Sequence, residues 1–276
     1  MHPPDHVRQM TTADIDAGLR LCRASGWNQL ESDWRLFLEC NPEGCRVVET
    51  EGRVTGTVAT LRYEDRFSWI SMLLVDPEVR RQGIGTRLLH TAMEILADMP
   101  SVRLDATPAG KTVYDRYGFL DEYRLTRMRA LQVSGAKSAA RRMTDADLPA
   151  ILERDREVFG ADRSGILRRL YSFAPEYALV TDGGYSFGRH GFRAGHIGPV
   201  VADHQNAART LVLAAASADP GRSFLIDAPH HSPDWVQWLE SAGFVAERPF
   251  IRMYRGSNPF PGLPERVFAI AGPELG

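Results

Sequence analysis

Cysteine is scarce in this 276-residue chain: the three present, Cys22, Cys40 and Cys45, all lie in its first sixth. Their number and spacing match neither a disulfide framework nor the ligand set of a zinc site. A few cysteines that belong to no disulfide framework are typical of a protein in a reducing compartment, so we expect a cytoplasmic location.

Long apolar runs and an excess of one charge are absent as well. No stretch approaches the roughly 18 apolar residues of a membrane-spanning helix, and we read no signal peptide in the polar segment 1–10. Lys and Arg total 33 against 35 Asp and Glu, a net charge of −2, which gives no broad basic surface. We therefore expect neither nucleic acid nor membrane as a partner.

The length and composition that remain indicate a folded protein with two domains or one large one. Hydrophobic residues make up 43% and charged residues 25%, the ordinary range for globular proteins. At about 150 residues per domain, the chain has room for two.

An internal repeat favours two domains. Residues 8–17 (RQMTTADIDA) resemble residues 141–150 (RRMTDADLPA), and in both a Thr precedes an apolar stripe with helical spacing. Similar endings follow, because Gly-Phe stands nine positions before Arg-Met both at 118–128 and at 243–253. We predict a first domain at 1–133, a linker at 134–138 and a second domain at 139–276.

Hydrophobic periodicity predicts an α/β fold with a mixed sheet in each copy. In the first copy we expect helices at 12–23, 32–40, 83–98 and 110–117 and strands at 45–50, 53–63, 67–75, 101–106 and 122–133. In the second we expect strands near 177–181, 184–190, 195–202, 223–228 and 248–255 and helices at 205–218 and 233–242.

A phosphate-binding pattern joins a buried strand to a helix in the first copy. The strand ends at Val75, a proline turn follows, and Arg80 to Gly85 read Arg-x-x-Gly-x-Gly at the entry to the helix. The free N–H groups and positive dipole of a helix N-terminus favour a phosphate. A helix start without a ligand is the alternative reading of Gly-x-Gly alone.

A second motif, Tyr-x-x-x-Gly-Phe at residues 114–119, follows about thirty residues later. With these two motifs in this order, residues 7–133 resemble the GNAT superfamily of acyl-CoA-dependent N-acyltransferases. The whole chain looks like the tandem GNAT proteins of bacteria, the YitH-like group, with two tandem GNAT-like domains that are each a mixed, mostly antiparallel sheet flanked by helices. In the second copy no glycine follows Asp203 at the place where the phosphate would lie, and we expect this copy to bind no CoA and to help form the acceptor site.

The resemblance implies acetyl-CoA as cosubstrate, bound by the end of the strand and by the loop: Leu73, Leu74, Val75, Arg80, Arg81, Gln82, Gly83, Ile84, Gly85 and Thr86. It also implies that a backbone N–H near Leu74 polarises the thioester carbonyl. Tyr114 is then the expected general acid for the CoA thiolate. The alternative for Tyr114 is packing or contact with CoA, and Tyr117 is the competing phenol.

The acceptor is expected to be a small-molecule amine that attacks directly in a ternary complex. Candidate acceptor contacts are Trp27, Asn28 and Asp105, with Glu64 and Asp65 as further carboxylates; each is also explained as a packing, turn or capping residue. Asp76 is interpreted as a turn residue. We expect no metal, since His196, His204, His230 and His231 lack ligand spacing.

Two other functions stay open at this point. The chain could transfer the acyl group to a protein amine, or it could be an acyl-CoA or small-ligand sensor that transfers nothing. Because one chain would supply two packed copies, a monomer is preferred over a homodimer.

Overall fold

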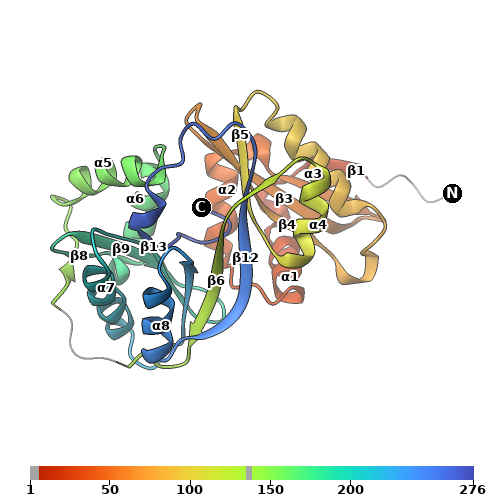
Figure 1. The fold of residues 1–276 in the computed structure, drawn as a ribbon. Helices are drawn as coiled ribbons and strands as arrows, with labels where there is room; N and C mark the ends of the chain where they lie inside the picture. The colour runs from red at the N-terminus through yellow and green to blue at the C-terminus, as the bar shows by residue number, and fades with distance from the viewer. Residues whose placement is uncertain (1–5, 135–138) are drawn as a thin grey trace. The chain divides into compact units, whose positions relative to one another are not determined.

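The structure, a computed structural model, describes residues 6–134 and 139–276 (Figure 1). Most of the predicted linker, residues 135–138, therefore lies outside the described residues. By its internal contacts the chain divides into two compact units, Met1–Leu104 and Asp105–Gly276, and each is described by itself. No helix within the described ranges is both long and apolar enough to cross a membrane.

The first unit contains a sheet with the order β1-β2-β3-β4-β5. Neighbouring strands are antiparallel except β4 and β5, which run parallel. The strands are β1 (His6–Gln9), β2 (Arg46–Thr50), β3 (Arg53–Tyr63), β4 (Phe67–Val75) and β5 (Ser101–Ala106), the last of which crosses the unit boundary.

Helices of the first unit bury one apolar face each. The α-helices are α1 (Ile15–Ala24), α2 (Glu31–Cys40) and α3 (Ile84–Ile95), and the short 3-10 helices are η1 (Thr12–Asp14), η2 (Pro42–Gly44) and η3 (Pro77–Val79). Helix α3 packs on β3 and β4 through Ile84 and Leu88. Gly56 on β3 makes this packing possible, because a Cβ there would lie 2.8 Å from both side chains.

The second unit contains a sheet with the order β12-β6-β11-β10-β9-β8-β7, and β13 pairs with β10. Its strands are β6 (Leu120–Ala130), β7 (Arg141–Arg142), β8 (Leu179–Thr181), β9 (Gly184–Arg189), β10 (Gly195–Ala202), β11 (Phe224–Pro229), β12 (Val245–Gly256) and β13 (Val267–Ala269). Its helices are α4 (Pro108–Arg116), α5 (Leu148–Phe159), α6 (Ser164–Phe173), α7 (Gln205–Ala218), α8 (Pro233–Ser241), η4 (Pro175–Tyr177) and η5 (Pro264–Arg266). Only β10 and β11 are parallel among the paired strands of this unit that the structure describes.

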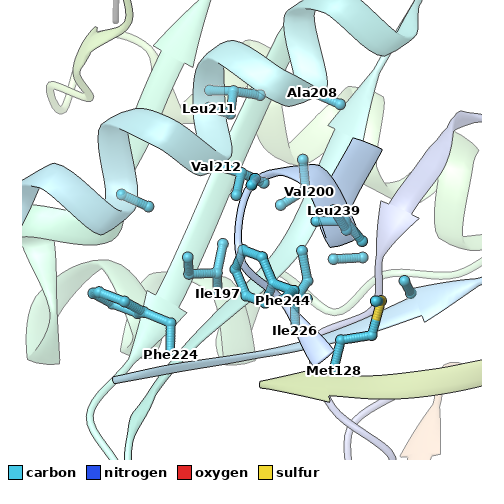
Figure 2. Close-up of a cluster of buried hydrophobic side chains, with 14 of the residues drawn as sticks. Met128, Ile197, Val200, Ala208, Leu211, Val212, Phe224, Ile226, Leu239 and Phe244 are labelled. Atoms are coloured by element: carbon cyan, nitrogen blue, oxygen red, sulfur yellow. The ribbon is translucent and has the colours of Figure 1, made fainter. Parts of the chain in front are cut away.

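The core of the second unit lies between helices and sheet. Figure 2 shows Leu211 and Val212 of α7 above Ile197 of β10 and Ile226 of β11. Met128 of β6 belongs to the same buried cluster. The strand that ends the first copy of the repeat thus contributes to the core of the second.

The repeat read from the sequence has matching geometry at its starts. Arg8 donates two hydrogen bonds of 2.8 Å to Asp14, and Arg141 donates two of 2.7 and 2.6 Å to Asp147. In both copies the Thr three residues before the Asp donates its backbone N–H and its hydroxyl to that carboxylate. The Arg-x-x-Thr-x-x-Asp pattern therefore fixes each first helical turn in the same way.

Two reciprocal ion pairs connect the copies. Arg127 on β6 donates two hydrogen bonds, of 2.9 and 2.8 Å, to Asp227 on β11. Arg252 on β12 donates two of 2.9 Å to Asp105. Each copy's last strand therefore supplies an arginine to the other copy's carboxylate, and the long strands β6 and β12 run side by side (Figure 1).

This exchange explains why the compact units differ from the copies of the repeat. Strand β6, which ends the first copy, pairs with β11 and β12 and so belongs by contacts to the second unit. Sequence similarity follows ancestry along the chain, whereas contacts follow strand pairing. The boundaries at 133 and 139 stay a prediction about the repeat.

The expected fold class is confirmed, with mixed, mostly antiparallel sheets and helices around them. Three strands match their predicted bounds at both ends, 53–63, 67–75 and 101–106 in the first copy, as do 195–202 and the helix 205–218 in the second. The sequence did not predict β1, β7 or β13, because strands of two to four residues show little alternation.

We expect Arg127→Met to destabilise the protein by about 3–5 kcal/mol, since it leaves Asp227 as a buried carboxylate without its main counter-charge. Burial opposes ionisation of Asp227, yet Arg127 and His196 hold its pKa below the ordinary range. Urea unfolding at neutral pH measures the change. The matched control is Arg35→Met, which breaks an exposed pair with Glu31 and should cost less than about 1 kcal/mol. Equal unfolding midpoints for the two variants would contradict the role of the pair.

Candidate active site

The loop after β4 is anchored at its start by Asp76. This buried carboxylate accepts hydrogen bonds from Arg20 at 2.5 Å, from Arg53 at 2.8 Å and from the backbone N–H of Glu78 at 3.2 Å. Burial would raise its pKa, but these donors lower it. Asp76 is thus more than the turn residue expected from sequence, because it ties the loop to α1 and β3.

The two glycines of the loop are not required by packing. Gly83 is the N-cap of α3, with φ of +85° and no side-chain cap, and a Cβ built on it would meet no atom within 4 Å. At Gly85 a Cβ would lie 3.4 Å from Val75 and 3.8 Å from Leu73, ordinary contact distances. Since nothing in the protein excludes a side chain at Gly85, close approach of a ligand to the backbone explains it best.

The loop between the anchor and the helix is basic and exposed. Arg80 donates to the backbone oxygen of Val75 at 3.3 Å, and Arg81 has φ of +65°, a conformation that a non-glycine residue adopts only at a cost. Gln82, Thr86 and Arg87 are exposed, whereas Ile84, the first residue of α3, is buried against β3. Uncapped N–H groups at the start of α3 next to these cations form a cradle for an anion.

One edge of β4 leads into this cradle. The parallel pairing with β5 involves Ser68 and Trp69, and within the described part of this unit no strand pairs with that edge further along. Leu73 and Val75 are half-buried and Leu74 is buried. The last third of β4 therefore offers backbone donors and acceptors to a ligand that runs along it toward Gly83.

Tyr114 belongs to the second unit, on α4. Thr107 caps this helix by accepting from the N–H of Gly110 at 3.2 Å. The Tyr114 ring packs against Phe119, with centroids 5.8 Å apart, and over Gly110, where a Cβ would lie 3.1 Å from it. Its hydroxyl has no hydrogen-bond partner among the described residues.

The surroundings of Tyr114 keep its phenol in the protonated form. Burial raises its pKa to about 12, so the phenol stays protonated across the neutral range. Tyr117 is half-buried three residues further on, at the C-cap of the same helix. The choice of Tyr114 over Tyr117 as general acid stays a prediction from the motif.

The candidate acceptor residues differ in how they are held. Trp27 and Asn28 follow α1, where the Trp27 backbone oxygen accepts from Arg23 at 3.3 Å and Asn28 is buried. Glu64 and Asp65 lie in the β3–β4 hairpin turn, at the opposite end of β4 from the glycine loop.

Asp105 has both carboxylate oxygens bonded to Arg252. Burial raises its pKa, and the Arg252 guanidinium opposes that rise. The Arg252 guanidinium therefore fixes the orientation of this carboxylate, and a role for Asp105 at the acceptor stays a prediction. The sequence carried no sign of this partner, which lies 147 residues further along the chain.

The corresponding region of the second copy is filled by the chain itself. Strands β10 and β11 pair in parallel from Gly195 to Ile197 only, and β13 then pairs with β10 at Val200 and Val201. The backbone N–H of Ile270, just after β13, donates to the backbone oxygen of Asp227 on β11 at 3.1 Å. The segment that contains β13 therefore bridges the two strands where they separate.

The N-terminus of α7, the corresponding helix of the second copy, is capped by a side chain. His204 caps α7, its ring accepting from the N–H of Ala207 at 3.2 Å, and Asp203 adjoins the cap. Asp203 is paired with Arg154, at 3.1 Å, and with Arg266. An anion would meet a side chain and a carboxylate here, whereas α3 presents uncapped N–H groups.

Comparison with known proteins also separates the two copies of the repeat. The chain matches the family model "Acetyltransferase (GNAT) family" over residues 16–119 and the model "Acetyltransferase (GNAT) domain" over residues 151–269. A solved structure of a putative acetyltransferase from Pyrococcus horikoshii is similar with a TM-score of 0.85 at 22% identity, covering 100% of this chain and 98% of that one. Fold and models together define an acyltransferase of the GNAT class.

Two relatives match along almost the whole chain. Holothin acyltransferase of Pseudoalteromonas sp. is 26% identical, with 92% of this chain and 88% of the relative covered. The uncharacterized N-acetyltransferase YitH of Bacillus subtilis is 24% identical, with 92% and 93% covered. The chain belongs to the GNAT acyltransferases and carries two GNAT domains in tandem, which confirms the resemblance read from its motifs.

Proposed function

We propose that the chain transfers an acetyl group from acetyl-CoA to the amine of a small-molecule acceptor, by direct attack in a ternary complex. The observation that carries this is the glycine-bearing start of α3, which has no side-chain cap, together with the edge of β4 that no strand pairs beyond Trp69 in the described part of the first unit. Membership in the GNAT family supports acyl transfer, and the name of the Pseudoalteromonas relative supports it too.

In this proposal the residues of the first copy bind the cosubstrate. The N–H groups from Gly83 to Thr86 hold the pyrophosphate, with Arg80, Arg81 and Gln82 beside it. The edge of β4 at Leu73, Leu74 and Val75 binds the extended arm. Tyr114 donates its phenolic proton to the leaving thiolate, and Trp27, Asn28 and the second copy contribute to the acceptor side.

The second copy is proposed to bind no acetyl-CoA. Its equivalent strand edge is covered by β13, and its helix start is capped by His204. A fold that satisfies these backbone groups internally has no free donors for a pyrophosphate or an acyl arm.

Calorimetric titration of the purified chain with acetyl-CoA should therefore show one binding site per chain. Thiol release with a panel of small amines then tests transfer, and binding without release to any amine would favour the sensor alternative. Two bound molecules per chain would contradict a filled second copy, and no binding would contradict the acyltransferase proposal itself.

Gly85→Ala should weaken acetyl-CoA binding at least about tenfold, because the added methyl group occupies the space that a phosphate needs next to the helix N-terminus. The fold should be unchanged or up to about 1 kcal/mol more stable, since alanine is the better helix former. Calorimetry and thermal unfolding measure the two effects.

Gly165→Ala is the matched control for Gly85→Ala. Gly165 also lies in the first turn of a helix, α6, and a Cβ there meets nothing within 4 Å. It should show the same effect on stability and none on binding. Unaltered acetyl-CoA affinity in Gly85→Ala would mean that the loop is only a helix start.

Tyr114→Phe should lower kcat by about 10² or more with little change in acetyl-CoA affinity, since a general acid contributes roughly 10² to 10⁴ in rate. Tyr117→Phe should keep the wild-type rate. With the pKa of Tyr114 at about 12, no loss of activity between pH 6 and about 10 should trace to ionisation of this phenol. Rates for both variants across that range, measured by thiol release, test this; an unchanged kcat in Tyr114→Phe would remove the assignment.

A further inference from the structure

Strand β4 is interrupted by a bulge in the stretch proposed to bind the cosubstrate. Thr57 of β3 lies opposite Leu74 and Ala59 lies opposite Ser71, so Val58 alone faces the two residues Met72 and Leu73. Met72 has φ of +52°, in the left-handed region. A buried methionine in this conformation costs about 1–2 kcal/mol, so other contacts must hold it there.

One of those contacts comes from Thr57. Its hydroxyl donates to the backbone oxygen of Met72 at 2.8 Å, and its side chain is fully buried. This hydrogen bond fixes the direction of the Met72 carbonyl at the point where the strand leaves its regular ladder.

Fixing that carbonyl also fixes an N–H group. The peptide unit between Met72 and Leu73 is a rigid trans plane, in which the carbonyl oxygen and the following N–H point in opposite directions. Because the oxygen points toward Thr57, the N–H of Leu73 points away from it, and β3 lies on the Thr57 side. The opposite edge of β4 is the one that β5 leaves unpaired beyond Trp69.

We propose that Thr57 is a positioning residue, which holds the bulge so that the N–H of Leu73 donates to the thioester carbonyl of bound acetyl-CoA. The carbonyl gains negative charge as the amine attacks, and a preorganised N–H stabilises that charge. This inference rests on the proposed function, and it adds a side chain to a contribution that the sequence assigned to main chain alone.

Thr57→Val tests the role, because valine keeps the branched shape and removes the hydroxyl. Thr57→Ser keeps the hydroxyl and removes a methyl group. We expect kcat to fall at least about tenfold in the valine variant, with acetyl-CoA affinity within about twofold of wild type, and the serine variant to recover most of the rate.

Thr60→Val is the control for a purely structural effect. Thr60 is also fully buried on β3 and also donates to a backbone oxygen, that of Gly44 at 3.4 Å. It should lose stability in urea unfolding comparable to Thr57→Val but keep kcat. Equal loss of kcat in both variants, or in Thr57→Val and Thr57→Ser alike, would overturn the proposal.

An infrared measurement separates this inference from the proposed function, since it needs no acceptor. The carbonyl stretch of ¹³C-labelled acetyl-CoA should move to lower frequency on binding to wild type and to Thr57→Ser, and that shift should be lost with Thr57→Val. Failure of acetyl-CoA to bind to wild type would refute the proposed function. Binding without a shift, or with the same shift in Thr57→Val, would refute the role of Thr57 alone.

Discussion

The two buried arginine–carboxylate pairs between the copies are the constraint on which the second unit depends. Arg127 and Arg252 lie on neighbouring strands, and each donates two hydrogen bonds to a carboxylate of the other copy. A buried charge without its partner costs several kcal/mol, so neither long strand can leave its place alone. The exchange of last strands within the second unit is therefore specified by paired charges as well as by apolar packing.

The sequence predicts most of this fold but not the exchange. Long strands such as 53–63 and 67–75 alternate strongly enough to give their own ends, and the Arg-Met pairs at 127 and 252 reveal the repeat. Nothing local shows that Arg127 meets Asp227, a partner 100 residues away, because pairing between strands is decided by tertiary contacts. The same reason hides the partner of Asp105, which sequence reasoning placed near the acceptor.

The residues of the candidate site are likewise predicted only in part from the sequence. The glycine loop and Tyr114 are found by motif, since their spacing follows from the local geometry of a strand, a turn and a helix. Thr57 and Met72 have no motif, because a threonine in a strand is ordinary and a bulge leaves no mark in the composition. Asp76 is read as a turn residue for the same reason: its two arginine partners come from positions 20 and 53.

The two copies treat the same backbone groups in different ways. In the second copy, β13 covers the strand edge and His204 caps the helix, so the backbone groups are satisfied within the protein. In the first copy, the equivalent edge of β4 and the start of α3 have no such partners in the described part of the first unit. Left-handed residues at 72 and 81 add conformational cost there. The same fold can remove these costs, as the second copy shows, so their presence in the first is best explained by a molecule that supplies the missing contacts.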